Sequence, residues 1–223
     1  LCELGGGLVK DIEEFLGDRW LLVDHHPVPE VELRHSSVFN AWQFGYDGSR
    51  EVSTAGMAYF IALLMDGRNV DLSWLPIIAA LGDRQDQGDS RSLTGLNRKI
   101  LDDAAKHGFI RVATDLILYG RETKPIHEAL ASTTTPYIPD LSGNRDACLA
   151  TVTSSGIEVK RKDHWRTVSE LTEDEKRKLV EAIIPHLAPS TTLEKRMSEL
   201  IGEVYTLDKE DEYSPLRDAR ELS

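Results

Sequence analysis

The strongest constraint on the fold is a continuous apolar run at residues 20–23 that ends directly in Asp24, His25 and His26. A run without alternating polar residues is typical of a strand buried on both faces of a parallel sheet. A short apolar segment at residues 1–4 and a helical pattern at residues 8–16 precede it, and Gly17 ends the helical pattern. The first 25 residues therefore predict a strand, a helix and a second strand parallel to the first.

Two apolar helix faces and one further strand are predicted in the first half of the chain. The face of the helix at residues 8–16 comprises Leu8, Ile12, Phe15 and Leu16. A second helix, over residues 53–67, has Met57, Phe60, Ile61 and Leu64 along one side. Residues 35–42 predict a short strand, and residues 96–107 predict a helix that Gly108 ends. Together these patterns predict an α/β domain with a parallel sheet and helices on both faces.

The local composition of the sequence changes near residue 120, where we place a domain boundary. Residues 119–144 are rich in Pro, Thr and Gly and predict connectors. Residues 145–156 predict a helix with a glycine stop, and residues 191–207 a helix followed by a short strand. Between them lies the clearest helix, over residues 172–187, with a capping box and the apolar stripe Leu179, Ile183 and Leu187.

This pattern divides the chain into three parts. Residues 1–120 predict the α/β domain, and residues 121–205 predict a mostly helical insertion. Residues 206–223 predict a return to the first domain or a linker. Because the chain starts without Met and resembles a strand already at its first residues, we expect it to be a fragment of a longer protein.

Composition limits the classes of protein that fit. The net charge of −12 argues against a nonspecific nucleic-acid coat, which would be basic. No apolar run reaches the roughly 20 residues that span a bilayer, so we expect a cytoplasmic protein with no membrane partner. Cys2 and Cys148 lack metal-site spacing and are predicted to be buried small hydrophobic residues.

Polar residues follow three apolar segments: Glu3, the triplet at 24–26, and Asp83. In an open α/β sheet, ligands bind beyond the carboxyl ends of the strands, so Glu3 and His25 are expected at one edge, where Asp83 could join them. Carboxylates with an imidazole suit Mn²⁺, Mg²⁺, Fe²⁺ or Co²⁺ better than a closed thiolate zinc site. The alternatives are a solvated glutamate at position 3 and a helix-capping aspartate at position 83.

Ser53 and Thr54 stand at a predicted helix start. Backbone N–H groups and a hydroxyl at such a position can hold a phosphate. Plain capping of the helix is the simpler explanation for the same two residues.

Several stretches resemble the DHH phosphoesterase superfamily, which is named for the triplet found here at 24–26. The similarity is greatest to the archaeal RecJ-like nucleases, including the GINS-associated nuclease. The stretches that carry it are CELGGG, VDHHPVP, GSREVSTAGMAYF, AALGDRQDQ, GLNRKILDDA, YGRETKPIHEAL, PYIPDLSG, RTVSELTEDEKRKL and SPLRDAREL. They span nearly the whole chain.

The resemblance implies a metal-dependent exonuclease that acts on single-stranded DNA or RNA in replication and repair. His25 and Asp83 would be ligands of Mn²⁺ or Mg²⁺, and Glu3 would bridge two such ions. Asp24 would orient the neighbouring imidazole, and His26 would face the scissile phosphate. Ser53, Thr54 and Arg84 are the predicted substrate-binding residues.

This sequence departs from the family pattern at two places. The family carries Asp where this chain has Glu3, and the extra methylene moves the carboxylate. The family's first motif, a His and two Asp, and its C-terminal substrate-binding domain are absent from this sequence. These departures put an intact two-metal site in doubt.

The resemblance therefore leaves two alternatives to the nuclease. One is a catalytically reduced relative that acts as a scaffold for GINS and the replicative helicase, with residues 121–205 as its partner-binding module. The other is a DHH phosphatase or cyclic-dinucleotide phosphodiesterase, which the long insertion disfavours.

Overall fold

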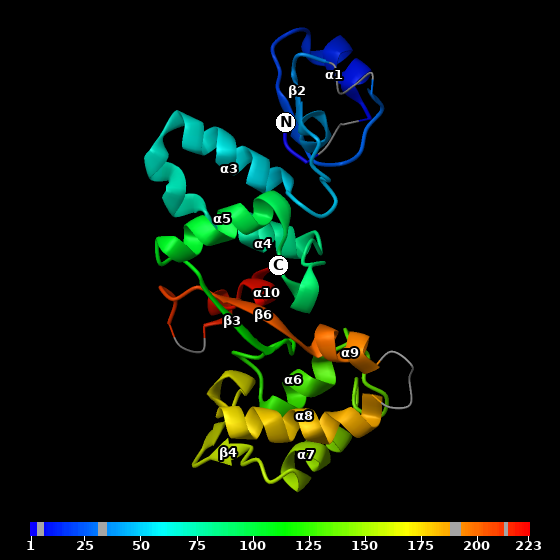
Figure 1. Cartoon of the computed structure of the whole chain (residues 1–223), viewed down its shortest axis with the longest axis vertical. Helices are drawn as coiled ribbons and strands as arrows, with labels where there is room; N and C mark the ends of the chain where they lie inside the picture. Colours follow the sequence, from blue (N-terminus) through cyan, green and yellow to red (C-terminus); the bar gives the residue numbers. More distant parts are fainter. Residues whose placement is uncertain (4–6, 31–34, 188–192, 212–213) are drawn as a thin grey trace. The chain divides into compact units, whose positions relative to one another are not determined.

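The structure is a computed structural model that describes residues 1–3, 7–30, 35–187, 193–211 and 214–223. The chain divides into two compact units (Figure 1). The first comprises Leu1–Gly88, Ser92–Arg111 and Ser223, and the second comprises Asp89–Arg91 and Val112–Leu222. The chain enters the second unit for most of its length after residue 111, whereas the sequence pattern places the boundary near residue 120.

A small parallel sheet forms the centre of the first unit. Strands β1 (Leu22–Asp24) and β2 (Val38–Asn40) are parallel, and Cys2 makes a further parallel bridge to Val23. The predicted helix and the strand that follows it are therefore confirmed, as is the short strand that becomes β2, whereas the predicted first strand is reduced to the single bridge at Cys2. Of the predicted first strand, residue 4 lies outside the described residues, as do residues 5 and 6.

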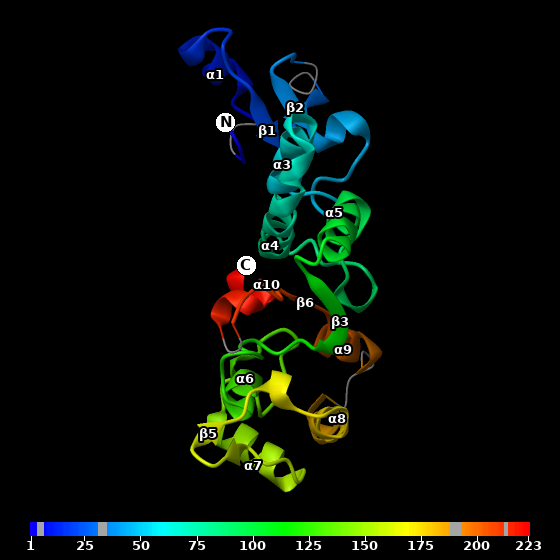
Figure 2. The same cartoon turned by 90° about the vertical axis from the view of Figure 1, so that its left-hand side faces the viewer.

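Helices cover both faces of this sheet (Figure 2). On one face, Leu22 packs with Val9 of α1 (Val9–Leu16). On the other face, Val23 packs with Met57 of α3 (Thr54–Met65). Successive residues of a strand point to opposite faces, so one short strand holds both layers together. The predicted α/β architecture with helices on both faces is confirmed.

The predicted apolar face of α1 is wrong. Leu8, Phe15 and Leu16 are exposed, Phe15 by 88%, and Val9 is the buried residue of the helix. Helix α1 contacts the sheet through Val9 in its first turn. The apolar side that the helical period predicts is therefore not the side that packs on the sheet. Within the described part of the chain, no residue buries the side chains of Leu8, Phe15 and Leu16.

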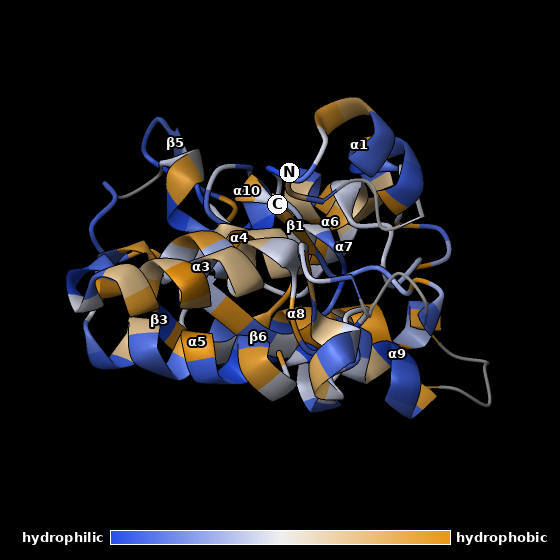
Figure 3. Ribbon diagram, turned by 90° about the horizontal axis from the view of Figure 1, so that it is seen from above, coloured by the Kyte–Doolittle hydropathy of each residue, from blue (hydrophilic) through white to orange (hydrophobic). Residues whose placement is uncertain are grey.

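The predicted face of α3 is wrong at its far end. Leu64 is 89% exposed, whereas the buried positions are concentrated in the first half of the helix. Met57 in that half packs with Val23 of β1. Because α3 is apolar around most of its circumference, as Figure 3 shows, periodicity alone could not identify its buried side.

The remainder of the first unit is helical. It comprises the short 3-10 helices η1 (Ala41–Phe44) and η2 (Gly67–Leu72) and the helices α4 (Trp74–Gly82) and α5 (Gly95–Lys106). Helix α4 contacts both α3 and α5. The apolar segment before Asp83 is thus a helix, and Asp83 follows a helix end rather than a strand end.

The second unit is mainly helical and contains two small sheets. Its strands are β3 (Arg111–Leu116), which pairs with β6 (Ile201–Thr206), and β4 (Lys160–Arg161), which pairs with β5 (His164–Trp165). Its helices are α6 (Ile126–Ser132), α7 (Arg145–Ser154), α8 (Glu173–Leu187), α9 (Leu193–Leu200) and α10 (Ala219–Leu222). Short 3-10 turns are η3 (Asp89–Arg91), η4 (Val168–Glu170) and η5 (Pro215–Arg217).

Helix α8 confirms its sequence signature. The Glu175 carboxylate accepts from Thr172 N at 2.9 Å, and Thr172 Oγ1 accepts from Glu175 N at 3.3 Å. Leu179, Ile183 and Leu187 are buried in the core that α6 and α7 share. The helices predicted at α7 and α9 and the strand predicted at β6 are also present, whereas α6, β3 and the β4–β5 hairpin were not predicted.

The two cysteines lie in different surroundings. Cys148 is buried, and burial raises the pKa of its thiol to about 11. Cys2 is exposed, so the prediction that it is buried is wrong. Within the described ranges, no helix is both long enough and apolar enough to cross a membrane.

Candidate metal centre

His25 is the central residue of the candidate site. It follows β1 and is buried, with 5% of its surface exposed. Its Nδ1 lies 2.7 Å from the carbonyl oxygen of Gly48. Its Nε2 lies 3.3 Å from Glu3 Oε1 and 3.8 Å from Asp83 Oδ2. One ring nitrogen is therefore anchored to the main chain, and the other faces two carboxylates.

Glu3 reaches this point from the neighbouring parallel segment. Its main-chain N–H donates to Val23 O at 3.1 Å, which keeps it alongside the end of β1. Its backbone has a φ of 72°, in the left-handed region that non-glycine residues seldom occupy. The side chain is half exposed. The longer glutamate thus extends from the strand end as far as the buried imidazole.

Asp83 reaches the same imidazole from the end of α4. Burial raises the pKa of Asp83, and the nearby Glu3 adds to the rise, while the proximity of His25 opposes it. Two carboxylates that approach one nitrogen repel each other, and a bound cation would relieve that repulsion. The carbonyl end of a helix also carries partial negative charge, which favours a cation there.

Asp24 fixes the orientation of His26. Asp24 is 1% exposed, and its Oδ1 accepts from His26 Nδ1 at 2.8 Å and from the main-chain N–H of His25 at 2.8 Å. Burial alone would raise the pKa of Asp24, but these hydrogen bonds lower it. The same hydrogen bond raises the pKa of His26. With Nδ1 engaged, Nε2 is the nitrogen through which His26 can meet a ligand.

The donor set fits a divalent cation. Glu3, His25 and His26 each offer a ligand atom, and these atoms lie within 4.8 Å of one another. Asp83 is adjacent through its contact with His25. Carboxylate and imidazole donors are ligand types that divalent cations take in proteins, and the set lacks the thiolates of a closed zinc site. The structure thus brings together Glu3, His25, His26 and Asp83, with Asp24 behind them.

The three predicted substrate-binding residues lie in different settings. Ser53 is buried and accepts from Gly56 N at 3.2 Å, so its hydroxyl caps α3. Thr54 is buried as well, and its hydroxyl has no hydrogen-bond partner among the described residues. Arg84 is exposed and adjoins Asp83, with a φ of 55°. Capping accounts for Ser53, and substrate contact for any of the three remains a prediction.

Several supporting residues were missed by sequence reasoning. Trp42 Nε1 donates to His25 O at 3.0 Å, and Asn40 Nδ2 donates to His26 O at 3.1 Å. Gln85 is fully buried, and its Nε2 donates to Gly48 O at 2.8 Å. Gln85 lies in the GDRQD stretch, which was a signal for it, whereas Gly48 lies in a loop with no signal beyond its glycine.

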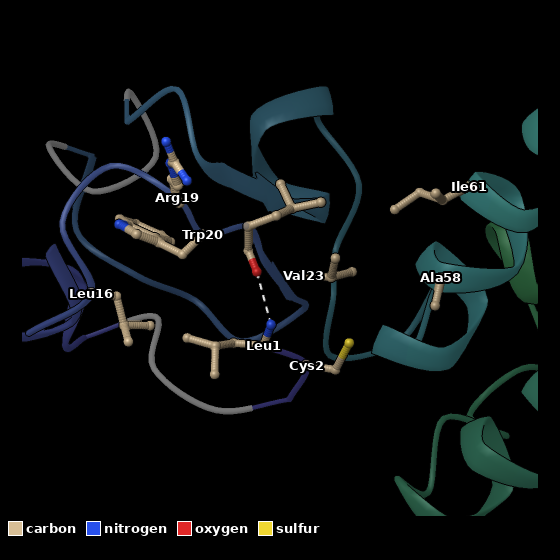
Figure 4. A pocket seen from close by; sticks show the side chains of 9 residues that line it. Leu1, Cys2, Leu16, Arg19, Trp20, Val23, Ala58 and Ile61 are labelled. Carbon is tan, nitrogen blue, oxygen red and sulfur yellow. Dashed lines mark hydrogen bonds between the residues drawn. The ribbon is translucent and has the colours of Figure 1, made fainter.

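A separate apolar pocket of about 580 Å³ lies elsewhere in the first unit (Figure 4). Its lining includes Trp20, Val23 and Ile61, and the exposed thiol of Cys2 opens onto it. The Leu1 amino group donates to Leu21 O at 2.8 Å at its margin. None of the predicted cation ligands lines this pocket, so it is distinct from the candidate metal centre.

The chain is similar to known proteins both in sequence and in fold. Residues 118–201 match the DHH-CID domain. An uncharacterized protein of Methanocaldococcus jannaschii is 30% identical over 185 residues, which is 82% of this chain and 39% of the relative. The crystal structure of CDC45 from Entamoeba histolytica superimposes with a TM-score of 0.62 at 12% identity, over 98% of this chain and 46% of that chain.

The chain therefore spans about 39% of the length of the curated relative that it matches. At 12% identity, the likeness to CDC45 shows a shared fold. The domain match falls on the helical unit that the sequence marks as an insertion. Residues 118–201 are thus similar to the DHH-CID domain, and the chain shares the fold of CDC45.

Proposed function

We propose that the first unit carries a divalent-cation-dependent phosphodiesterase site that removes nucleotides from single-stranded DNA or RNA. The observation that carries the proposal is the convergence of Glu3 and Asp83 on Nε2 of His25. A buried imidazole with one nitrogen anchored and the other facing two carboxylates supports this proposal, because metal-ligating histidines are commonly oriented in this way.

The residues of the site would have different roles in the reaction. Glu3, His25 and Asp83 would hold Mn²⁺ or Mg²⁺, and bound ions supply activation of a water and stabilisation of the leaving oxygen. Asp24 holds His26 so that its Nε2 faces outward from the strand end. The raised pKa of His26 favours the protonated ring, which can donate a hydrogen bond to a phosphate oxygen.

The test is nucleotide release from end-labelled single strands by the full-length protein in Mn²⁺. We expect His25→Ala and Asp83→Ala to lose activity by at least about 100-fold, because each removes a ligand. His107→Ala is the matched control, since His107 is exposed and its Nδ1 lies 2.8 Å from Asp103 O of its own helix. An inert parent protein, or variants as active as the parent, would exclude the nuclease function.

A second candidate function is partner binding by residues 121–205. The DHH-CID match at residues 118–201 favours it, as does the hydrophobic core that α6, α7 and α8 share. In this role the chain would act as a scaffold that docks GINS and the replicative helicase. Exchange of residues 121–205 for a short linker should abolish capture of GINS while leaving Mn²⁺ binding intact, and unchanged capture would remove this assignment.

A further inference from the structure

A small hairpin in the second unit gathers basic side chains in a chain that is acidic as a whole. Strands β4 and β5 pair antiparallel, with Lys160 opposite Trp165. Arg161 ends β4, and Lys162 lies in the turn between the two strands. Residues 160–165 are all exposed. They carry three cations and a single carboxylate, whereas the whole chain has a net charge of −12.

Two of the three cations have no carboxylate partner among the described residues. Lys160 and Lys162 form no ion pair there, and Arg161 lies 3.6 Å from Glu158 in a pair whose side chains are both more than half exposed. Such an exposed pair contributes little and exchanges readily with another anion. The other carboxylates of this region are those of Asp163 and of Glu170, which is paired with His164 at 2.9 Å. The positive charge of the hairpin is therefore available to an anionic partner.

Trp165 exposes an indole beside these cations. It is 41% exposed although its side chain is large and mostly apolar. Its ring lies 5.2 Å from the ring of the buried His127 of α6, which holds the indole in place. Lys160 Nζ lies 5.4 Å from the centre of the indole. Directly opposite residues of a hairpin project from the same face, so the lysine and the indole reach the surface together.

Cations beside an exposed indole are the combination by which many proteins bind single-stranded nucleic acid. Lysine and arginine contact the phosphates, and an unpaired base stacks on the aromatic ring whatever its identity. In a duplex the bases stack on one another and cannot reach the indole. An acidic peptide would use the cations but has no planar base for Trp165. The exposed indole thus favours a single-stranded nucleic acid over an acidic protein.

We infer that the β4–β5 hairpin binds single-stranded DNA or RNA, with a base stacked on Trp165 and the phosphates on Lys160, Arg161 and Lys162. None of these residues belongs to the candidate metal centre. The inference rests on the proposed function for the substrate class, while the binding that it describes needs neither a cation nor cleavage. Binding by the hairpin can therefore be measured apart from the reaction.

The experiment measures binding of a labelled oligothymidylate of about 15 nucleotides to the full-length protein in EDTA, by fluorescence anisotropy. Trp165→Ala should weaken binding by at least about 5-fold, because the stacked base loses its platform. Trp165→Phe keeps an aromatic ring and should recover most of that loss. Joint replacement of Lys160 and Lys162 by Gln should weaken binding and reduce its salt dependence, lowering the slope of log K against log salt by about 1.

Two exposed residues elsewhere in the second unit supply matched controls. Tyr137 is 59% exposed, and Lys178 is an exposed lysine of α8. Tyr137→Ala and Lys178→Gln remove an aromatic ring and a cation of the same kinds from sites outside the hairpin. Both variants should bind the oligonucleotide as the parent does.

The results decide between the possible occupants of the hairpin. Unchanged binding by either folded hairpin variant overturns the inference, as does a parent protein that binds no oligonucleotide in EDTA. If Trp165→Ala does not fold, the double lysine variant decides alone, because both lysines are exposed. Competition by polyglutamate equal to that by unlabelled oligonucleotide would also overturn the inference, in favour of an acidic protein partner. If the hairpin variants lose binding but the parent releases no nucleotides in Mn²⁺, the hairpin assignment stands and the proposed function fails.

Discussion

At the scale of single residues, the site depends on groups that hold other groups in place. Asp24 holds His26, and the Gly48 carbonyl holds His25. Neither supporting group offers a ligand atom to the cluster of Glu3, His25 and His26. Partners that fix the orientation of an imidazole in this way are common beside metal-ligating histidines.

Substitution of Gly48 should disturb the site without touching a ligand. In Gly48→Ala the new Cβ would meet His25 O, so the loop must move away from the imidazole. We expect a loss of about 1–3 kcal/mol in the free energy of unfolding and weaker Mn²⁺ binding. Chemical denaturation and a Mn²⁺ titration measure the two effects.

Gly67→Ala serves as the control for this substitution. A Cβ at Gly67 would meet nothing within 4 Å. We expect its stability to stay within about 0.5 kcal/mol of the parent's. If Gly48→Ala were equally silent, the close approach of the loop to His25 would not matter for the site.

At the scale of elements, sequence patterns predicted which segments are helices or strands better than they predicted which side of each element is buried. The capping box and apolar stripe of α8 were correct because both follow from local hydrogen bonds and helical period. The buried side of α1 was wrong, because it depends on how the helix meets the sheet. Strand β3 was missed since its residues are mostly exposed and carry no alternation of burial.

The start of α8 is tied to a buried arginine. Arg166 is 0% exposed, and its two terminal nitrogens donate to the Glu175 carboxylate at 2.6 and 2.8 Å. This pairing lowers the pKa of Glu175 to about 2. Its folded pKa is thus depressed, so the stabilisation is present above the ordinary value and is lost as the pH falls from about 4.5 to 2.

Glu175→Gln should cost about 3–5 kcal/mol at pH 7, because it leaves a buried charge without its partner. The control is Asp174→Asn, which breaks the exposed Asp174–Arg177 ion pair in the same turn. That change should cost less than about 1 kcal/mol. Denaturant titrations of both variants test the contrast, and equal losses would contradict the structural role of the buried pair.

Asp218, just before α10, should have the opposite pH dependence. Burial raises its pKa to about 6, against the opposing charge of Arg121. Because the folded pKa is raised, the folded state binds the proton more tightly. Stability should therefore fall as the pH rises from about 4 to 6.

Asp218→Asn removes this titration while keeping the oxygen that accepts from Arg220 N. The variant should be more stable than the parent at pH 7.5 by about 1–3 kcal/mol. At pH 4 the two proteins should unfold alike. Thermal unfolding at both pH values makes the comparison, and a variant that is equally stable or less stable at pH 7.5 would contradict a raised pKa of Asp218.

At the scale of the whole molecule, the chain combines an α/β unit, built on a small parallel sheet, with a second, mainly helical unit. The order of the motifs in the sequence predicted both the parallel sheet and the residues that meet at its edge. It did not predict that Asp83 lies at a helix end, nor that the buried Gln85 lies beside His25. Those features depend on contacts between residues such as His25 and Gln85, which lie far apart in the sequence.

The central claim is that Glu3, His25 and Asp83 hold a divalent cation. Its most direct test is Mn²⁺ binding to the full-length protein, followed by electron paramagnetic resonance. We predict that His25→Ala and Asp83→Ala each weaken binding by at least about 10-fold, while His107→Ala binds as the parent does. Equal Mn²⁺ binding by the parent and both ligand variants would contradict the account.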